Sequence, residues 1–494
     1  MKKINFCEDW KFAPKGRDFE PVTLPHDAQI RELRTPDASD SGHGFFPGGV
    51  YIYEKRFTPP EEWQNQEVFI EFEGVYRNCT VSLNGQEIGG HRYGYTNFLL
   101  PLDLRIGEEN VLTVTADNSE LPNSRWYTGS GIYRPVWLYL GGKEHIAWQG
   151  VKITTLSVKP AAIRVQTEVT GGDVCVEILS ENTVCAKGEG TDCRLELPGA
   201  KLWSDKSPFL YTCRVTLFKD GRKVDETEEQ FGVRKLRWSS RGLFINGRSV
   251  KLRGGCVHHD NGLLGTAAID RAEVRKAELL KAQGYNAVRT SHNLPSEAFL
   301  YACDSIGLLV IDECFDQWEE AKRRDDYSNY FSKEKQTIID GKPVGTGVTN
   351  FEYDAALMVR RDRNHPSIIM WSIGNEIAQR SDVPRGKEIA DAITCAIKNE
   401  DATRPTTLAV NDYWDRMPQK MTWEKDSPRA FELVEVGGYN YETRRYESDH
   451  EKFPQRIMYG SETYPNAVAA NWSVINRHPY IIGDFVWTAI DYIG

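Results

Sequence analysis

Two apolar segments of the chain each end in a glutamate. Residues 367–376 end in Glu376, and residues 456–462 end in Glu462. Each segment is typical of a buried parallel strand, and side chains at the carboxyl-terminal tips of barrel strands face the cleft in which such barrels carry out chemistry. Two carboxyl groups at such tips can act together as an acid and a base or nucleophile. The sequence therefore predicts that Glu376 and Glu462 form a catalytic pair.

The distance between these two carboxyl groups would decide how they react. A separation of about 5 to 5.5 Å lets one carboxylate attack directly, and the configuration at the attacked carbon is retained. A separation of about 6.5 to 9.5 Å leaves room for a water molecule and gives inversion. Strand order does not fix a distance, so the residues alone leave both outcomes open.

Other polar residues follow the neighbouring predicted strands and are expected at the same rim. They are His258, His259, Arg289, His292, Asp312, Glu313, Asp316, Asn375, Asn440 and Tyr441. Several such groups on one rim indicate a site rather than isolated structural residues. Beside a carboxylate nucleophile, Arg289 would favour the charged form and Tyr441 would donate a hydrogen bond. Asn375 carries an amide that can bind a sugar hydroxyl.

Three tryptophans near the predicted rim have flat apolar faces against which a sugar ring could lie: Trp318, Trp371 and Trp487. Trp371 falls inside an apolar run, so we expect it to pack within the barrel. Trp487 stands at the end of the last predicted strand, so we expect it to contact the ligand.

The pattern of apolar residues changes twice along the chain. Residues 1–145 alternate apolar and polar positions and contain an Asn84-Gly85 hairpin signal, which predicts a β-sandwich of jelly-roll type. Residues 146–236 contain short strands at the spacing of an immunoglobulin-like sandwich. Residues 237–494 alternate strands with helices, which is typical of parallel strands covered by helices.

The third part is predicted to be a (β/α)8 TIM barrel. Its eight strands are expected near residues 250–252, 287–289, 308–311, 368–371, 407–410, 434–439, 457–459 and 481–487. Its helices are expected near residues 270–283, 296–306, 353–361, 386–398 and 467–476. A hairpin at residues 243–250 precedes it. The last helix is absent because the sequence ends at Gly494, so the chain is expected to be a fragment or to have that side sealed by another part.

Composition excludes several classes of protein. The 494 residues carry a formal net charge of -10, which disfavours a nucleic-acid partner. Eighteen consecutive apolar residues occur nowhere, and the N-terminal residues become charged before an apolar segment develops. The ten cysteines are scattered without a C-x-x-C pair, as expected for free thiols. We therefore expect a cytoplasmic protein that binds neither nucleic acid nor a membrane.

Cofactor motifs are not found in the sequence. It has no Gly-rich phosphate loop, dinucleotide fingerprint or H-E-x-x-H pair. The acidic residues of the predicted rim have no spacing that singles out a metal site. No cofactor and no metal are predicted.

Five short motifs are spread over nearly the whole chain. They are Leu-Pro-His-Asp at 24–27, Gly-Ser-Gly-Ile-Tyr-Arg at 129–134, Phe-Gly-Val-Arg at 231–234, Arg-Asn-His-Pro-Ser at 363–367 and Gly-Asn-Glu at 374–376. In these motifs the chain resembles glycoside hydrolase family 2, which includes bacterial β-galactosidases, β-glucuronidases and β-mannosidases. The resemblance implies a jelly roll of the sugar-binding type, an immunoglobulin-like module and a TIM barrel, in the order given by the periodicity.

The resemblance also implies roles for individual residues. Glu376 would be the general acid/base and Glu462 the nucleophile of a retaining mechanism. Sugar contacts would come from Asn375, His258, Arg289, His292, Tyr441 and Trp487. The first-strand motif of the family is Asn-x-His-Glu, whereas this chain has Cys256-Val257-His258-His259.

The expected activity is that of an exo-acting, retaining β-galactosidase with a small carbohydrate as its substrate. Residues 485–492 are more similar to β-galactosidases than to β-glucuronidases, whose carboxylate-binding Asn-x-Lys would lie beyond the last residue. A β-glucuronidase and a carbohydrate-binding protein without turnover are the alternatives. A structural adhesin is disfavoured because the sequence has no export signal. The sandwich edges offer contacts between subunits, so a homo-oligomer is expected.

Overall fold

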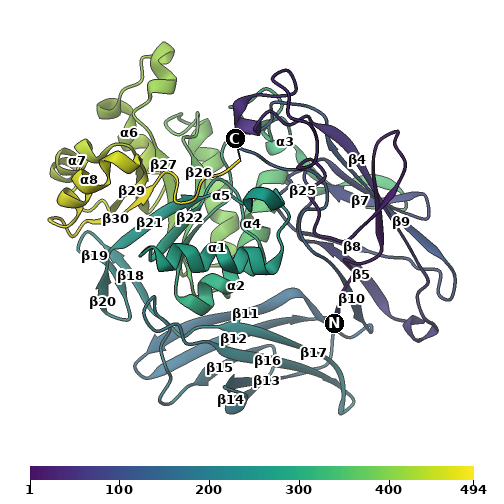
Figure 1. Ribbon diagram of the computed structural model, residues 1–494. Coiled ribbons are helices and arrows are strands. Elements are labelled where there is room, and N and C mark those ends of the chain that lie inside the picture. Colours follow the sequence, from purple (N-terminus) through teal and green to yellow (C-terminus); the bar gives the residue numbers. More distant parts are fainter. Residues whose placement is uncertain (494) are drawn as a thin grey trace.

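The computed structural model describes residues 1–493, apart from the side chains of residues 417 and 418. Two β-sandwiches and a closed barrel make up the molecule (Figure 1). The first sandwich stands beside the barrel, and the second lies below it in this view. The predicted fold class, sandwiches followed by a TIM barrel, is confirmed.

The first sandwich consists of two sheets that enclose one apolar core. The sheet orders are β1-β10-β5-β8 and β3-β2-β4-β9-β6-β7. Their strands are β1 (Lys2–Asn5), β2 (Trp10–Pro14), β3 (Glu20–Val22), β4 (Gly49–Phe57), β5 (Glu67–Phe72), β6 (Cys79–Leu83), β7 (Gln86–His91), β8 (Phe98–Pro101), β9 (Asn110–Asn118) and β10 (Val136–Gly141). Along β9 every second residue is buried, as its alternating sequence predicts. The Asn84-Gly85 turn joins β6 to β7 with both residues at positive φ, so the predicted hairpin is confirmed.

The second sandwich pairs a three-stranded sheet, β11-β12-β15, with a four-stranded sheet, β14-β13-β16-β17. Its strands are β11 (Ile146–Val158), β12 (Ala161–Val169), β13 (Asp173–Ser180), β14 (Thr183–Glu189), β15 (Asp192–Glu196), β16 (Tyr211–Lys219) and β17 (Arg222–Phe231). A separate sheet of β18 (Leu236–Ser239), β19 (Gly242–Ile245) and β20 (Arg248–Val250) leads into the barrel. The domain boundaries after residues 145 and 236 stay predictions.

Eight parallel strands close the barrel in chain order. They are β21 (Leu252–Val257), β22 (Ala287–Thr290), β23 (Leu309–Glu313), β26 (Ile368–Asn375), β27 (Thr406–Val410), β28 (Val436–Asn440), β29 (Met458–Thr463) and β30 (Ile481–Val486). The helices of this part are α1 (Asp270–Ala282), α2 (Glu297–Ile306), α3 (Ser328–Phe331), α4 (Asn350–Asp362), α5 (Arg385–Glu400), α6 (Trp423–Phe431), α7 (Tyr446–Lys452) and α8 (Val468–Ile475). No helix follows β30 within the described residues.

Some sequence-based expectations need correction. The first barrel strand was expected at residues 250–252, but Val250 pairs with Leu243 in the preceding sheet and the barrel strand begins at Leu252. Helices α3, α6 and α7 were not predicted. Neither was the hairpin of β24 (Glu334–Ile339) and β25 (Lys342–Thr349), which is inserted between β23 and α4.

The barrel strands are buried on both faces, which explains their nearly continuous apolar sequences. Trp371 in β26 is fully buried, and its indole Nε1 donates to Asp401 at 3.0 Å. The expectation that it packs within the barrel is therefore confirmed. Trp318 is also fully buried, and its Nε1 donates to the carbonyl of Ile373 at 3.0 Å.

A buried aspartate joins the first sandwich to the barrel. The carboxylate of Asp27 accepts hydrogen bonds from the hydroxyl of Tyr127 at 2.8 Å and from the backbone N–H groups of Gln29 and Thr266 at 2.9 and 2.8 Å. Thr266 belongs to the barrel, whereas the other donors belong to the sandwich. Gly129 passes so close that an added Cβ would lie 2.0 Å from Thr266 Oγ1. The junction thus uses Asp27 of the Leu-Pro-His-Asp run and Gly129 of the Gly-Ser-Gly run.

A second buried cluster joins the sandwich to helix α4. His91 Nε2 lies 2.7 Å from an oxygen of Asp354, and the hydroxyl of Tyr327 donates to the other oxygen of this carboxylate.

Within the described residues, no helix is long and apolar enough to cross a membrane. All ten cysteines have free thiols, and most of them are buried.

Replacing Asp27 by alanine should lower the free energy of unfolding by about 3 kcal/mol, because it leaves several buried donors without an acceptor. Calorimetry and urea unfolding would measure the loss. Asp18→Ala is the matched control, since Asp18 is exposed. Equal unfolding midpoints for the two variants would contradict the role given to Asp27.

Candidate active site

The two predicted carboxylates both lie at the carboxyl-terminal mouth of the barrel. Glu376 directly follows β26, and Glu462 lies near the end of β29. Glu376 and Tyr441 each follow a strand with positive φ, at 45° and 63°. Residues other than glycine rarely adopt this conformation, and such residues cluster at functional sites.

Glu462 is held by two donors. Arg289 Nη1 donates to its Oε1 at 2.9 Å, and the hydroxyl of Tyr441 donates to its Oε2 at 2.7 Å. Burial and the neighbouring charge of Glu462 raise the pKa of Tyr441 above its usual value, so the hydroxyl keeps its proton and remains a donor. Both oxygens of Glu462 are therefore fixed in place.

Glu376 has a different environment. Asn440 Nδ2 donates to its Oε1 at 3.1 Å, and Arg125 Nη1 lies 3.8 Å from its Oε2. The hydrogen bond to the Glu376 carboxyl group thus comes from a neutral amide, and the cation of Arg125 lies outside hydrogen-bonding distance. The two carboxylates differ in how tightly the protein holds them.

A continuous chain of hydrogen bonds connects these two glutamates. Asn375 Oδ1 accepts from Arg289 Nη2 at 2.9 Å and from Asn440 Nδ2 at 3.1 Å. Arg289 also binds Glu462, and Asn440 also binds Glu376. The positions of both carboxyl groups therefore depend on the same three side chains.

Glu313 fixes Arg289 from the other side. Its carboxylate accepts from Arg289 Nε at 2.9 Å and Nη2 at 3.0 Å, and it lies 2.6 Å from His292 Nδ1. Burial acts to raise the pKa of Glu313, but Arg289 and His292 outweigh burial and hold it below its usual range. Glu313 is therefore ionised and helps to neutralise the buried guanidinium.

Three aromatic side chains pack against His258 and His292 at the barrel mouth. Trp487 stacks on His292 with ring centroids 5.2 Å apart, and Trp126 stacks on His258 at 5.3 Å. Tyr492, beyond the last strand, meets His258 edge-on at 4.3 Å. Burial lowers the pKa of His258 well below its usual value, so its imidazole is neutral.

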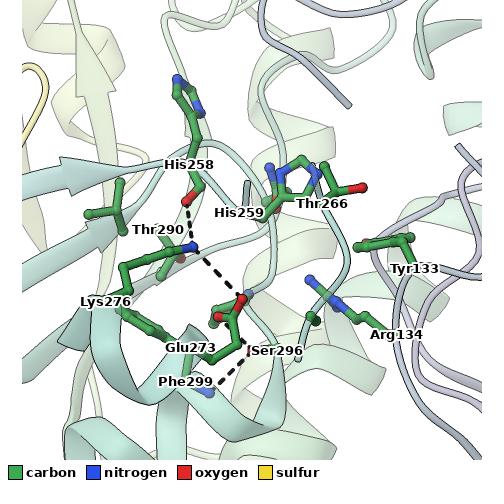
Figure 2. Close-up of a pocket in the computed structure, with 14 residues that line it drawn as sticks. Tyr133, Arg134, His258, His259, Thr266, Glu273, Lys276, Thr290, Ser296 and Phe299 are labelled. Carbon is green, nitrogen blue, oxygen red and sulfur yellow. Dashed lines mark hydrogen bonds and ion pairs between the residues drawn. The ribbon is translucent and has the colours of Figure 1, made fainter. Parts of the chain in front are cut away.

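Helix α1 and the start of α2 hold the backbone of His258. Figure 2 shows its imidazole directed away from Lys276 and Glu273, while its carbonyl accepts from Lys276 Nζ at 3.4 Å. Lys276 pairs with Glu273 at 3.8 Å, and Glu273 accepts from Ser296, the N-cap of α2, at 3.0 Å. The small cavity between them, about 20 Å³ in volume, lies behind the histidine.

The first sandwich contributes to the mouth of the barrel. Arg125 donates to both oxygens of Asp316, with its Nε at 2.9 Å and its Nη2 at 2.5 Å. Lys322 Nζ donates to Asp316 at 2.8 Å and to the carbonyl of Asn375 at 2.7 Å. Burial acts to raise the pKa of Asp316, but Arg125 and Lys322 outweigh it and hold the pKa well below its usual value.

The structure brings the residues predicted from the sequence together. Glu376, Glu462, Asn375, Arg289, His292 and Tyr441 form one hydrogen-bonded or ion-paired group, and His258 and Trp487 lie against His292. His259 faces the cavity behind the mouth. Asp312 is fully buried beside Thr290. Sequence reasoning missed Arg125, Trp126 and Lys322. Within the described residues, no group of three or more potential ligands is arranged to hold a metal ion.

Two family models match the chain. Residues 237–493 match the TIM barrel domain of glycosyl hydrolases family 2, and residues 150–234 match a second model, described as glycosyl hydrolases family 2.

Named relatives include proteins of two specificities. A protein named beta-galactosidase from Bacteroides ovatus is 28% identical, covering all of this chain and 68% of the relative. A protein named putative beta-glucuronidase from Formosa agariphila is 31% identical, covering all of this chain and 52% of the relative. The chain thus spans half to two-thirds of the length of these relatives.

Solved structures show the same similarity. A glycosyl hydrolase family 2 member from Bacteroides cellulosilyticus superimposes with a TM-score of 0.90 and 36% identity, covering all of this chain and 65% of that one. A second structure of a member from that species gives a TM-score of 0.87 and covers 68% of that chain. With the family model covering more than half of its residues, the chain belongs to glycoside hydrolase family 2.

Proposed function

We propose that the chain is a retaining exo-glycosidase that releases terminal β-D-galactose from β-galactosides. The observation that carries this proposal is the unequal environment of the two mouth carboxylates. Glu462 is paired with a guanidinium and a phenol, whereas Glu376 has an amide and a more distant cation. Two carboxyl groups in different environments are suited to different roles.

Glu462 is proposed as the nucleophile. A nucleophilic carboxylate must be ionised and must be held against the carbon that it attacks. The ion pair with Arg289 stabilises the charge, and the bond from Tyr441 fixes the second oxygen. When one oxygen of Glu462 becomes an ester oxygen, Arg289 and Tyr441 can keep their hydrogen bonds to the carboxyl group without moving.

Glu376 is proposed as the general acid and base. A group that gives up and regains a proton in each cycle cannot be fixed by a strong ion pair. Its single hydrogen bond from Asn440 orients the carboxyl group, and the gap to Arg125 leaves the other oxygen free to reach a leaving group.

The proposed reaction has two displacements. Glu376 gives its proton to the glycosidic oxygen while Glu462 attacks the anomeric carbon, and the bond to the leaving alcohol breaks. Glu376, now a carboxylate, takes a proton from water, and the resulting hydroxide attacks the anomeric carbon and releases Glu462. Two inversions give net retention.

Among the remaining predicted residues, His258 and Trp487 are proposed to bind the sugar. His258 Nε2 is buried and has no hydrogen-bond partner among the described residues, so it is free for a hydroxyl group. Trp487 is partly exposed and stacks on His292, which suits it to cover a sugar ring. Asn375 and Arg289 already bind protein groups and act mainly by positioning the glutamates.

Galactose is preferred over glucuronic acid in this proposal because of the similarity of residues 485–492 to β-galactosidases. The relative from Bacteroides ovatus carries that name, whereas others are named β-glucuronidases. A cytoplasmic location and a homo-oligomeric state stay predictions.

Replacing Glu462 by glutamine should lower kcat on nitrophenyl β-D-galactoside by roughly 10³-fold or more, because the amide cannot form the covalent intermediate. Steady-state release of nitrophenol measures the change. Glu278→Gln, on the exposed face of α1, is the control. Turnover at the parent rate would remove Glu462 from its role.

Replacing Glu376 by alanine should slow hydrolysis of substrates with poor leaving groups by roughly 10²-fold or more. Dinitrophenyl galactoside should still form the intermediate, because its leaving group needs no proton, and azide should then restore turnover and yield the β-galactosyl azide. An α-azide, or no effect of azide, would contradict the assignment to Glu376.

The wild-type chain should hydrolyse nitrophenyl β-D-galactoside with a kcat/KM at least about tenfold above that for the β-D-glucuronide. A panel of nitrophenyl glycosides compared under identical conditions gives the ratio. The reverse ratio would identify a glucuronidase. Saturable galactose binding with no release from any substrate would identify a carbohydrate-binding protein without turnover.

A further inference from the structure

A narrow cavity opens beside the candidate site, between the first sandwich and the loop that follows β23. Arg125, Trp126, His292 and Asp316 form its wall on the side of the barrel mouth. Its volume is about 30 Å³, room for roughly two water molecules. It is therefore too small for a sugar ring but large enough for a compact polar group attached to one.

The wall of this cavity is rich in cations. Its basic residues are Arg77, Arg92, Arg125, Lys322 and Arg323, whereas its acidic residues are Asp316 and Asp326. Asp316 forms ion pairs with Arg125 and Lys322. Asp326 accepts from the backbone N–H groups of Lys322 and Arg323 at 2.8 and 2.9 Å. Neither carboxylate therefore forms an ion pair with the side chain of Arg77, Arg92 or Arg323.

Arg77 is the most unusual of these residues. It is only 4% exposed, and its Nε and Nη2 atoms are buried without a hydrogen-bond partner in the part of the chain that the structure describes. Its nearest carboxylate is Glu120, 3.6 Å away and largely exposed to solvent. A buried guanidinium with unused donors is costly unless an anion completes its hydrogen bonds.

Two further arginines reinforce the charge at Arg77. Arg323 also has a buried Nε without a partner among the described residues, and its Nη2 pairs with Asp40 at 3.5 Å on the outer rim. Arg92 is exposed, with its guanidinium 5.5 Å from the ring of Tyr330. Guanidinium groups bind sulfate and carboxylate oxygens through paired N–H donors.

We propose that this cavity binds a sulfate ester carried by the galactoside substrate, through Arg77 and Arg323. The proposal rests on the proposed glycosidase function, because the substituent reaches the cavity from a sugar held at Glu376 and Glu462. It makes the first sandwich a determinant of specificity, since Arg77 belongs to that sandwich.

Binding of inorganic sulfate tests the cavity without any need for turnover. Titration at constant ionic strength, followed by the thermal midpoint and by tryptophan fluorescence, should give saturable binding to the wild-type chain. Arg77→Gln should weaken it at least about tenfold, whereas Arg105→Gln, which removes an exposed arginine of the same sandwich, should leave it unchanged. Equal binding by these variants would overturn the proposal.

Hydrolysis tests whether a sulfate ester on the substrate reaches the cavity. We would compare nitrophenyl galactosides sulfated at O3 or at O6 with the unsubstituted galactoside. For one of the charged substrates, Arg77→Gln should lower the charged-to-neutral ratio of kcat/KM at least about tenfold, and Arg323→Gln should lower it in the same direction. Unchanged ratios for every charged substrate would contradict the proposal.

Two controls keep the result decisive. Should Arg77→Gln fail to fold by circular dichroism, Arg77→Lys and Arg323→Gln would replace it, and sulfate binding equal to wild type in both would overturn the inference. Loss of hydrolysis on all substrates with sulfate binding intact would refute the proposed function and leave the anion site standing.

Discussion

The structure of the barrel mouth depends on one buried guanidinium. Arg289 is fully enclosed and binds Glu462, Glu313 and Asn375 at once. A buried positive charge is stable only when its donors are satisfied and its charge is balanced. The carboxylates around it meet both needs, and their geometry follows from the rigid fork of the guanidinium. Asn375, which Arg289 orients, accepts a hydrogen bond from Asn440, and Asn440 also donates to Glu376. Arg289 of β22 therefore sets the positions of both carboxyl groups.

The barrel does not form this site alone. Arg125 and Trp126 come from the first sandwich, and they reach Asp316 and His258 only because the sandwich is fixed against the barrel. The buried hydrogen bonds of Asp27 provide that fixation at one side of the junction. A sandwich without catalytic residues of its own therefore supplies side chains to the barrel mouth. The anion site proposed at Arg77 would give the same sandwich a part in substrate choice.

The pattern of apolar residues predicted most of the fold because it differs between the two architectures. Sandwich strands alternate apolar and polar residues, whereas the barrel alternates apolar strands with helices. The site residues were predictable because each follows a strand, and the ends of parallel strands meet at one rim. Helix α6 was not predicted because Pro428 lies within it, and α3 and α7 were not predicted because they are short. The hairpin of β24 and β25 carries an Asp340-Gly341 turn, which is a sequence signal for such a hairpin. Arg125 could not be placed, because no local pattern tells which loop of one domain will meet another.

The proposed mechanism requires that Glu462, held by Arg289 and Tyr441, forms a covalent bond with the sugar. A 2-deoxy-2-fluoro galactoside with a good leaving group slows the second displacement and allows the intermediate to accumulate. Mass spectrometry of peptides from the inactivated protein would then locate the label. We expect one sugar per chain, attached to Glu462. A label on another residue, or turnover of this substrate without any labelled peptide, would contradict the proposed mechanism.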